Sequence, residues 1–258
     1  MGKLDGRVVI ISGAARGQGE QEARLFAEEG ASVVLGDVLD ERGEAVAGEI
    51  GERAAYVPLD VRREEDWAAA VALARERFGR LDGLVNNAGI LRFRELADTS
   101  VEEYREVVEV NQVGCFLGMK AVVAEMEAAG GGTIVNVASY AALSGMAFLT
   151  SYAATKAAIL GMTRVAALEL AGKGIRVNVV CPGAIDTPMA RPPGSFGVGD
   201  GTDDALDALY AKVVPQARIG RPEEVARLAL FLTGEDSSYI TGQPVVIDGG
   251  WLAGVSVF

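Results

Sequence analysis

The fold of this chain is decided near its N-terminus, by Arg7-Val8-Val9-Ile10-Ile11-Ser12-Gly13-Ala14-Ala15-Arg16-Gly17-Gln18-Gly19. A short apolar run, typical of a buried strand, leads into a glycine-rich turn, and a helical pattern follows from Glu22 to Glu29. Such a turn lets backbone N–H groups and a helix N-terminus approach a pyrophosphate. The spacing is G-x-x-x-G-x-G rather than G-x-G-x-x-G, so a plain structural turn is the alternative. The position of the turn after the first strand favours a nucleotide site.

Strand and helix patterns alternate along the rest of the chain. No internal repeat, low-complexity tract or linker divides its 258 residues. Short connections between alternating strands and helices predict a single α/β domain, residues 1–258, with a Rossmann-like, doubly wound, seven-stranded parallel sheet and helices on both faces. The expected strands are 7–12, 32–37, 54–59, 83–86, 133–138, 176–180 and 243–248, and the expected helices include 64–78, 101–129, 203–214 and those beginning at 151 and 222.

Several polar or small residues follow directly after predicted strands. Ligands in doubly wound sheets bind at the carboxyl ends of the strands, so these residues should converge on one edge. They are the glycine-rich turn, Asp37, Asp60, Asn87, Ser139 and Pro182-Gly183.

The acid at the end of the second strand indicates which dinucleotide is bound. Asp37 falls about 18 residues after Gly19, close to the ~20-residue offset of a ribose-binding acid. A 2′-phosphate would be repelled by this carboxylate, which favours NAD over NADP. Arg16 in the turn favours the opposite choice, because a guanidinium can receive a 2′-phosphate. A helix-capping acid is the other interpretation of Asp37.

A second decisive stretch is Ser151-Tyr152-Ala153-Ala154-Thr155-Lys156. In a helix its phenol and ammonium lie on one face, one turn apart. A phenol titrates near ~10, so proton transfer near neutral pH requires its phenolate to be stabilised, which a fixed cation can do. The spacing alone also fits a surface pair. The chain has no histidine, so proton transfer must rely on Tyr, Lys or carboxylates.

Composition restricts the partners. The net charge of −12 makes nucleic acid an unsuitable partner, and no apolar run reaches ~18 residues, so we expect no membrane partner. No signal-peptide core begins the chain, which favours the cytoplasm. Cys115 and Cys181 lie in apolar contexts without C-x-x-C spacing, so we expect buried thiols and no metal site.

Two late segments differ from the rest of the chain. Residues 188–202 are rich in proline and glycine, and with the helical pattern after them they predict a mobile substrate loop or lid at about 188–215. A disordered surface excursion is the alternative. The tail from Trp251 to Phe258 is apolar, so we expect it to pack in the core or between subunits.

These motifs together resemble the classical short-chain dehydrogenase/reductase family over essentially the whole chain. The resemblance is carried by the glycine-rich turn, Asn87-Ala88-Gly89, Asn111, Ser139, Tyr152-x-x-x-Lys156, Pro182-Gly183 and Asp248-Gly249-Gly250. Within the family the stretches 33–41 and 82–90 are most similar to bacterial NAD-dependent hydroxysteroid dehydrogenases. The turn is also similar to that of carveol dehydrogenases, although the insertion usual there after the second strand is absent.

The resemblance implies a role for each matched residue. Tyr152 would exchange a proton with the substrate oxygen, Ser139 would hydrogen-bond that oxygen, Lys156 would lower the pKa of Tyr152 and hold the nicotinamide ribose, and Asn111 would fix a water beside Lys156. The implied cofactor-binding residues are Gly13, Arg16, Gly17, Gln18, Gly19, Asp37, Val38, Asp60, Val61, Asn87, Ala88, Gly89, Tyr152, Lys156, Pro182, Gly183, Ile185 and Thr187. Asp60 and Val61 would flank the adenine, and Ile185 and Thr187 would hold the carboxamide.

The implied activity is reversible, NAD-dependent conversion of a secondary alcohol, such as a cyclic, steroid-like or terpenoid hydroxyl, to its ketone by a homotetramer. An NADPH-dependent 3-ketoacyl reductase and a non-catalytic NAD-binding sensor or subunit are the alternatives. Leu91, Ala141, Phe148 and the segment 189–201 are expected to shape the substrate pocket. The chain departs from the family at Ser12, where threonine is usual, and at Gln18, where an apolar residue is usual.

Overall fold

The structure, a computed structural model, describes residues 2–191 and 203–254, with the backbone alone at 203–206. Seven parallel strands form one sheet in the order β3-β2-β1-β4-β5-β6-β7, which confirms the predicted architecture. The strands are β1 (Val8–Ser12), β2 (Ser32–Asp37), β3 (Ala54–Pro58), β4 (Gly83–Asn86), β5 (Gly132–Val137), β6 (Ile175–Pro182) and β7 (Pro244–Ile247). Strand order reverses between β1 and β4, so the crevice for a ligand opens above these two strands.

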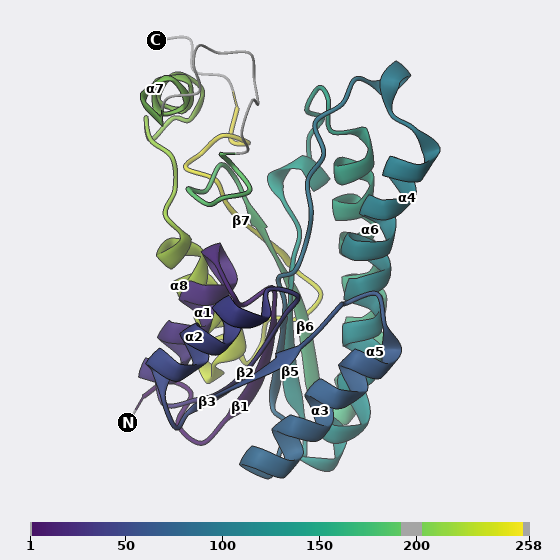
Figure 1. Cartoon of the computed structure of the whole chain (residues 1–258), viewed down its shortest axis with the longest axis vertical. Helices are drawn as coiled ribbons and strands as arrows, with labels where there is room; N and C mark the ends of the chain where they lie inside the picture. Colours follow the sequence, from purple (N-terminus) through teal and green to yellow (C-terminus); the bar gives the residue numbers. More distant parts are fainter. Residues whose placement is uncertain (1, 192–202, 255–258) are drawn as a thin grey trace.

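Helices cover both faces of the sheet (Figure 1). One face carries α1 (Gly17–Glu28), α2 (Asp40–Ile50) and α8 (Pro222–Thr233), and the other carries α3 (Glu64–Phe78), α4 (Val101–Val108), α5 (Gly114–Ala128) and α6 (Thr150–Leu170). Helix α7 (Asp203–Val213) lies apart, beyond the carboxyl ends of the strands. Short helical turns occur at η1 (Leu96–Asp98), η3 (Tyr140–Ala142), η4 (Ala171–Lys173) and η5 (Glu235–Ser237).

Both faces of the sheet are buried. Along β1, Val8 and Ile10 point into the core under α3, α5 and α6, whereas Val9 and Ile11 point into the core under α1, α2 and α8. The parallel register aligns Ile10 with Val34 on one side and Leu84 on the other, all three in the first core. Because side chains on both faces of the sheet are buried, the strands appear in the sequence as continuous apolar runs.

The helix predicted at 101–129 contains a wider turn. Between α4 and α5 the chain forms a π-helix, η2 (Glu109–Val113), which places Asn111 inside the protein at 1% exposure. Valines on both sides of Asn111 are weak helix formers, and π turns often mark functional sites. By length and composition Val101–Ala128 could cross a membrane, but 44% of its apolar window is buried within the protein, and core helices pass the same test.

The start of the first helix was predicted incorrectly. Helix α1 begins at Gly17 rather than at Glu22, so two glycines of the turn belong to its first helical turn. A Cβ at Gly19 would lie 2.3 Å from the carbonyl oxygen of Gly13. The glycine therefore permits close packing of the helix start against the turn, a tertiary requirement that local helix propensity does not reveal.

Glu22 is an unexpected member of the core. It is 0% exposed on the buried side of α1, and neither carboxyl oxygen has a hydrogen-bond partner among the described residues. Burial alone raises the pKa of this carboxyl from 4.5 to about 8. The folded protein therefore holds a proton here that the unfolded chain releases near pH 4.5.

This shift predicts the pH dependence of stability. Because the folded-state pKa is raised, the contribution of Glu22 is fully present below pH 4.5 and is lost as the pH rises through about 8. Each unit of pKa difference corresponds to about 1.4 kcal/mol. Glu22→Gln should therefore raise the urea midpoint relative to wild type at pH 9 and change it little at pH 5. The control is Glu28→Gln, exposed on the same helix. Equal effects of Glu22→Gln at both pH values would contradict the prediction.

Candidate active site

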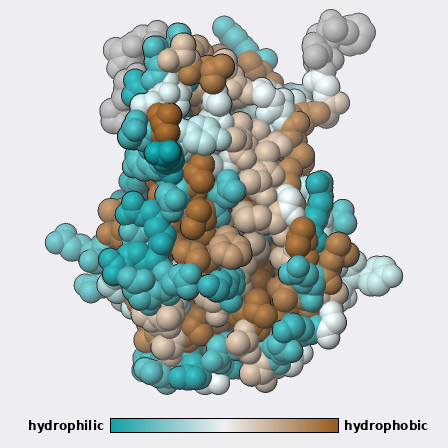
Figure 2. Space-filling model, turned by 90° about the vertical axis from the view of Figure 1, so that its right-hand side faces the viewer, coloured by the Kyte–Doolittle hydropathy of each residue, from teal (hydrophilic) through white to brown (hydrophobic). Residues whose placement is uncertain are grey.

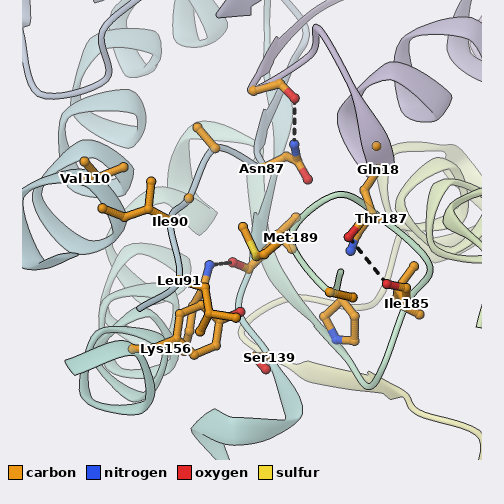
Figure 3. Close-up of a pocket in the computed structure, with 18 of the residues that line it drawn as sticks. Gln18, Asn87, Ile90, Leu91, Val110, Ser139, Lys156, Ile185, Thr187 and Met189 are labelled. Carbon is orange, nitrogen blue, oxygen red and sulfur yellow. Dashed lines mark hydrogen bonds between the residues drawn. The ribbon is translucent and has the colours of Figure 1, made fainter. Parts of the chain in front are cut away.

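A cavity of about 420 Å³ lies at the carboxyl ends of the strands. Figure 3 shows Gln18, Asn87, Ser139, Lys156 and Thr187 arranged around it. It is lined by every residue expected to bind the cofactor except Gly19, namely Gly13, Arg16, Gly17, Gln18, Asp37, Val38, Asp60, Val61, Asn87, Ala88, Gly89, Tyr152, Lys156, Pro182, Gly183, Ile185 and Thr187. Gly19, in the first turn of α1, is buried.

The glycine-rich turn closes tightly on the loop after β4. Gly13 has φ +68°, and a Cβ there would lie 2.8 Å from Ala88 Cα. Asn87 Nδ2 donates to the carbonyl oxygens of Ser12 and Gly13, both at 3.1 Å, and the Ser12 hydroxyl accepts from Ala88 N at 3.2 Å. Serine thus keeps the hydroxyl contact at the position where threonine is usual. These bonds fix the turn beside the N-terminus of α1, where backbone N–H groups can stabilise an anion.

Asp37 is fixed by backbone donors at the end of β2. Its Oδ2 accepts from Ala15 N at 2.9 Å, and its Oδ1 accepts from Val38 N at 2.8 Å and Leu39 N at 3.1 Å. The carboxylate is 8% exposed and lines the cavity. Arg16 also lines the cavity and is exposed. A rigid carboxylate with one remaining lone-pair site, on Oδ2, suits a hydroxyl donor and disfavours a phosphate.

Ser139, Tyr152 and Lys156 meet at the other end of the cavity. Ser139 follows β5, while Tyr152 and Lys156 lie on α6, and all three are buried. Lys156 Nζ donates to the Val137 carbonyl at 2.8 Å and lies 5.5 Å from the centre of the Tyr152 ring. The end of β5 and the first turns of α6 therefore bring a hydroxyl, a phenol and an ammonium together.

Burial has the largest effect on the pKa values of Tyr152 and Lys156. It raises the pKa of Tyr152 to about 12, opposed by a hydrogen bond with Ser139, and it lowers the pKa of Lys156 to about 8. Removal from water disfavours the Tyr152 phenolate, and this effect exceeds that of the Ser139 hydrogen bond, which favours it. The role expected of Lys156, lowering the pKa of Tyr152, stays a prediction.

Asn111 lies behind the cavity rather than on its wall. Its Oδ1 accepts from Ile90 N at 2.8 Å, and its Nδ2 donates to Ile90 O at 2.9 Å and to Thr155 Oγ1 at 3.2 Å. A Cβ at Gly89 would lie 3.2 Å from Asn111 Oδ1 and 3.4 Å from Lys156 Nζ. Asn111 thus ties the loop after β4 to α6 next to Lys156.

Three aromatic residues that were not expected in the pocket, Tyr140, Tyr210 and Trp251, line the cavity together with Tyr152. Tyr140 and Trp251 are stacked with centroids 4.4 Å apart, and Tyr210 of α7 meets Trp251 edge-on at 6.0 Å. The wall also contains Leu91, Phe93, Met146, Leu149 and Met189. Trp251, at the start of the apolar tail, is half-buried on the cavity wall. Residues 255–258 lie outside the described part, so packing of the tail in the core or between subunits stays a prediction. These aromatic contacts join segments that are distant in the sequence. The sequence alone therefore shows that the residues are apolar but does not predict that they touch.

Two expected pocket residues do not line the cavity. Phe148 is 52% exposed at φ +69°, and Ala141, within η3, is buried. Leu91 and Met189 do line it. Of the expected lid, the structure describes 188–191 and α7, with Arg191 paired to Asp186 at 2.6 Å and to Asp207 at 2.9 Å. Residues 192–202 lie outside the described part, so the mobility of the loop stays a prediction.

Within the described residues, no cluster of three or more His, Cys, Asp or Glu side chains forms a metal site. Cys115 and Cys181 are buried free thiols, as predicted, and burial raises their pKa values to about 12 and about 11.

The site fits a nicotinamide dinucleotide. Its volume lies in the range of ligand pockets, about 300–1,000 Å³. It offers a carboxylate at one end, a helix N-terminus with glycines that permit close approach in the middle, and a Tyr–Lys pair at the other end. The buried, unpartnered Oε1 of Gln18 adds a polar atom on this wall that the protein leaves unsatisfied.

Comparisons with known proteins agree with this geometry. A family model described as Enoyl-(Acyl carrier protein) reductase matches residues 13–252. A 3-alpha-(or 20-beta)-hydroxysteroid dehydrogenase of Mycobacterium tuberculosis is 42% identical over 99% of this chain and 93% of its own length. The 2,5-dichloro-2,5-cyclohexadiene-1,4-diol dehydrogenase LinX of Sphingobium indicum is 40% identical over 98% of this chain and 99% of its own.

A crystal structure of a short-chain type dehydrogenase/reductase from Mycobacterium marinum superposes with a TM-score of 0.89 at 33% identity, covering 97% of each chain. The matches extend over nearly the whole chain and include every element that forms the cavity. The chain therefore belongs to the short-chain dehydrogenase/reductase family and is an oxidoreductase that acts on CH–OH groups.

Proposed function

We propose that the protein is an NAD-dependent dehydrogenase that interconverts a cyclic secondary alcohol, steroid-like or terpenoid, and its ketone. The observation that carries this proposal is the shared cavity, which has Ser139, Tyr152 and Lys156 at one end and Asp37 at the other. When bound, the oxidised cofactor supplies the hydride acceptor and a positive charge beside the phenol.

The chain's own residues manage the proton. Ser139 hydrogen-bonds the substrate oxygen, and Tyr152 takes its proton during oxidation and returns it during reduction. Because burial alone keeps the pKa of Tyr152 near 12, catalysis near neutral pH requires positive charge around it. Lys156 supplies one such charge, held by the Val137 carbonyl, and we assign to it a hydrogen bond to the cofactor ribose. Asn111 steadies this pair through Ile90 and Thr155.

The walls near Tyr152 favour an apolar ring. Phe93, Met146, Tyr210 and Trp251 offer aromatic and sulfur surfaces and no charge. The two relatives are named for a hydroxysteroid and for a cyclohexadiene diol. Pro188, Met189, Ala190 and Tyr210 of α7 line this end, and we assign segment 188–191 and α7 to a lid of a single catalytic domain of residues 1–258. The two buried free thiols suit a reducing compartment, so we place the reaction in the cytoplasm, without nucleic acid or membrane partners.

Tyr152→Phe tests the mechanism. The change removes the transferable proton with little change in shape, so turnover should fall roughly 10²–10⁴-fold while NADH binding is kept. Turnover is measured as NADH formation across cyclic, steroidal, terpenoid and short aliphatic secondary alcohols. Tyr239→Phe, the same change on a fully exposed ring, is the control. Retained turnover in Tyr152→Phe would disprove the mechanism, and cofactor binding by wild type without turnover on any substrate would support a non-catalytic NAD-binding protein instead.

The choice between NAD and NADP rests on Asp37. An NADPH-dependent ketoacyl reductase is the competing activity, because a relative named 3-oxoacyl-[acyl-carrier-protein] reductase is 40% identical over 96% of this chain. Asp37→Ala should raise the ratio of kcat/KM with NADPH to that with NADH at least roughly tenfold, because it removes the charge that repels a 2′-phosphate. Asp40→Ala, a neighbouring acid outside the cavity wall, should leave the ratio unchanged. A wild-type preference for NADPH would contradict the assignment.

The outer face of α5 and α6 supports self-association. Phe116, Val165 and Leu168 are 49%, 55% and 83% exposed, and a Cβ at Gly161 would meet open space. Figure 2 faces this side and shows apolar side chains gathered in a broad band. Monomers rarely expose such contiguous apolar surface, so we propose that it packs against other copies in a homotetramer.

Leu168→Glu tests this contact by placing a charge in the apolar face. Sedimentation velocity should show a tetramer for wild type and a smaller species for the variant. Leu96→Glu, on η1 and 74% exposed, should sediment as wild type. A stable wild-type monomer would refute the homotetramer.

A further inference from the structure

Gln18 is a polar residue at a place in the glycine-rich turn where the family usually has an apolar one. It lines the cavity together with Ile185 and Thr187. In Figure 3 its side chain extends from the start of α1 toward Thr187, across the space between the turn and the segment after β6. The amide therefore lies between the part of the cavity at the turn and the part beside Tyr152.

The protein leaves this amide unsatisfied. Gln18 Oε1 is shielded from solvent and has no hydrogen-bond partner among the described residues. Its polar neighbours are committed elsewhere, since Asn87 Nδ2 donates to two backbone carbonyls and Thr187 Oγ1 donates to Ile185 O at 3.4 Å. A buried acceptor without a donor is costly, typically ~1–3 kcal/mol, so such an atom needs an explanation.

The missing partner must be a donor, and few groups of a dinucleotide qualify. The phosphates have no donor, and both kinds of adenosine donor belong elsewhere, the adenine amine between Asp60 and Val61 and the ribose hydroxyls at Asp37. The nicotinamide ribose belongs at Lys156. The carboxamide N–H of the nicotinamide is the donor that remains between the turn and Tyr152. The terminal torsion of glutamine is soft, so Oε1 can turn into the cavity at little cost.

We propose that Gln18 Oε1 accepts a hydrogen bond from the carboxamide N–H of the bound nicotinamide and thereby fixes the ring beside Tyr152. This inference rests on the proposed function but not on the choice between NAD and NADP, because both carry the same nicotinamide. Gln18 is thus a cofactor-positioning residue, and an apolar side chain at this position cannot make this hydrogen bond.

The test compares dissociation constants, measured by calorimetry, for wild type and Gln18→Met, which keeps the side-chain volume and removes the acceptor. Three ligands are used: the reduced dinucleotide that wild type binds more tightly, its 3-acetylpyridine analogue, which has a carbonyl but no N–H, and ADP-ribose, which has no nicotinamide. Gln18→Met should weaken binding of the natural dinucleotide roughly two- to tenfold and leave the other two unchanged. Gln21→Met, on the same helix but outside the cavity wall, should change none of the three.

Each result decides between the outcomes. Equal losses for all three ligands would mean that the variant disturbs the turn, and no loss for the natural dinucleotide would mean that the bond is absent, so either overturns this inference alone. An equal loss for the natural dinucleotide and the acetylpyridine analogue would place the contact at the carbonyl and overturn it as well. Wild type that binds neither dinucleotide overturns the proposed function and this inference together.

Discussion

The hydrogen bond from Lys156 Nζ to the Val137 carbonyl, 2.8 Å long, is the contact on which the rest of the site depends. It joins the end of β5 to the second turn of α6, directly beneath the position where Gly89 must approach without a side chain. An ammonium that is 3% exposed is costly to bury, and its pKa falls to about 8 as a result. The structure thus maintains a cation that is easily neutralised next to a phenol that burial makes hard to ionise.

The doubly wound sheet separates the two ends of the site, one proposed to bind the adenosine ribose and the other proposed to transfer a proton. Asp37, which we propose receives the adenosine ribose, lies at the end of β2, on one side of the point where strand order reverses, and Ser139 lies after β5, on the other side. The tight turn between them forms only because Gly13 and Gly19 have no Cβ, which would clash with Ala88 Cα and with the Gly13 carbonyl oxygen. Parallel strands fix these distances through the core, so the relative positions of Asp37 and Ser139 are set by the packing of the sheet.

Much of this arrangement could be predicted from the sequence because it depends on local order along the chain. The strands are apolar runs, and the residues after them, such as Asp37 and Ser139, must share one edge of a parallel sheet. Three kinds of feature could not be predicted. The stacking of Trp251 on Tyr140 joins distant segments, the π turn at Asn111 reflects its bonds to Ile90, and the burial of Glu22 places a charged residue type in the core. Each is decided by tertiary packing that overrides local propensity.

The central claim is that Tyr152 becomes an acid–base group near neutral pH only when Lys156 and a bound oxidised nicotinamide act on it together. The most direct measurement is the pKa of Tyr152 itself, followed by NMR of isotope-labelled tyrosine and assigned with Tyr152→Phe. The account predicts a pKa near 12 in the protein alone and a fall of several units with saturating NAD⁺, which Lys156→Met largely abolishes. A pKa that does not move on NAD⁺ binding, or a fall that persists in Lys156→Met, would contradict it.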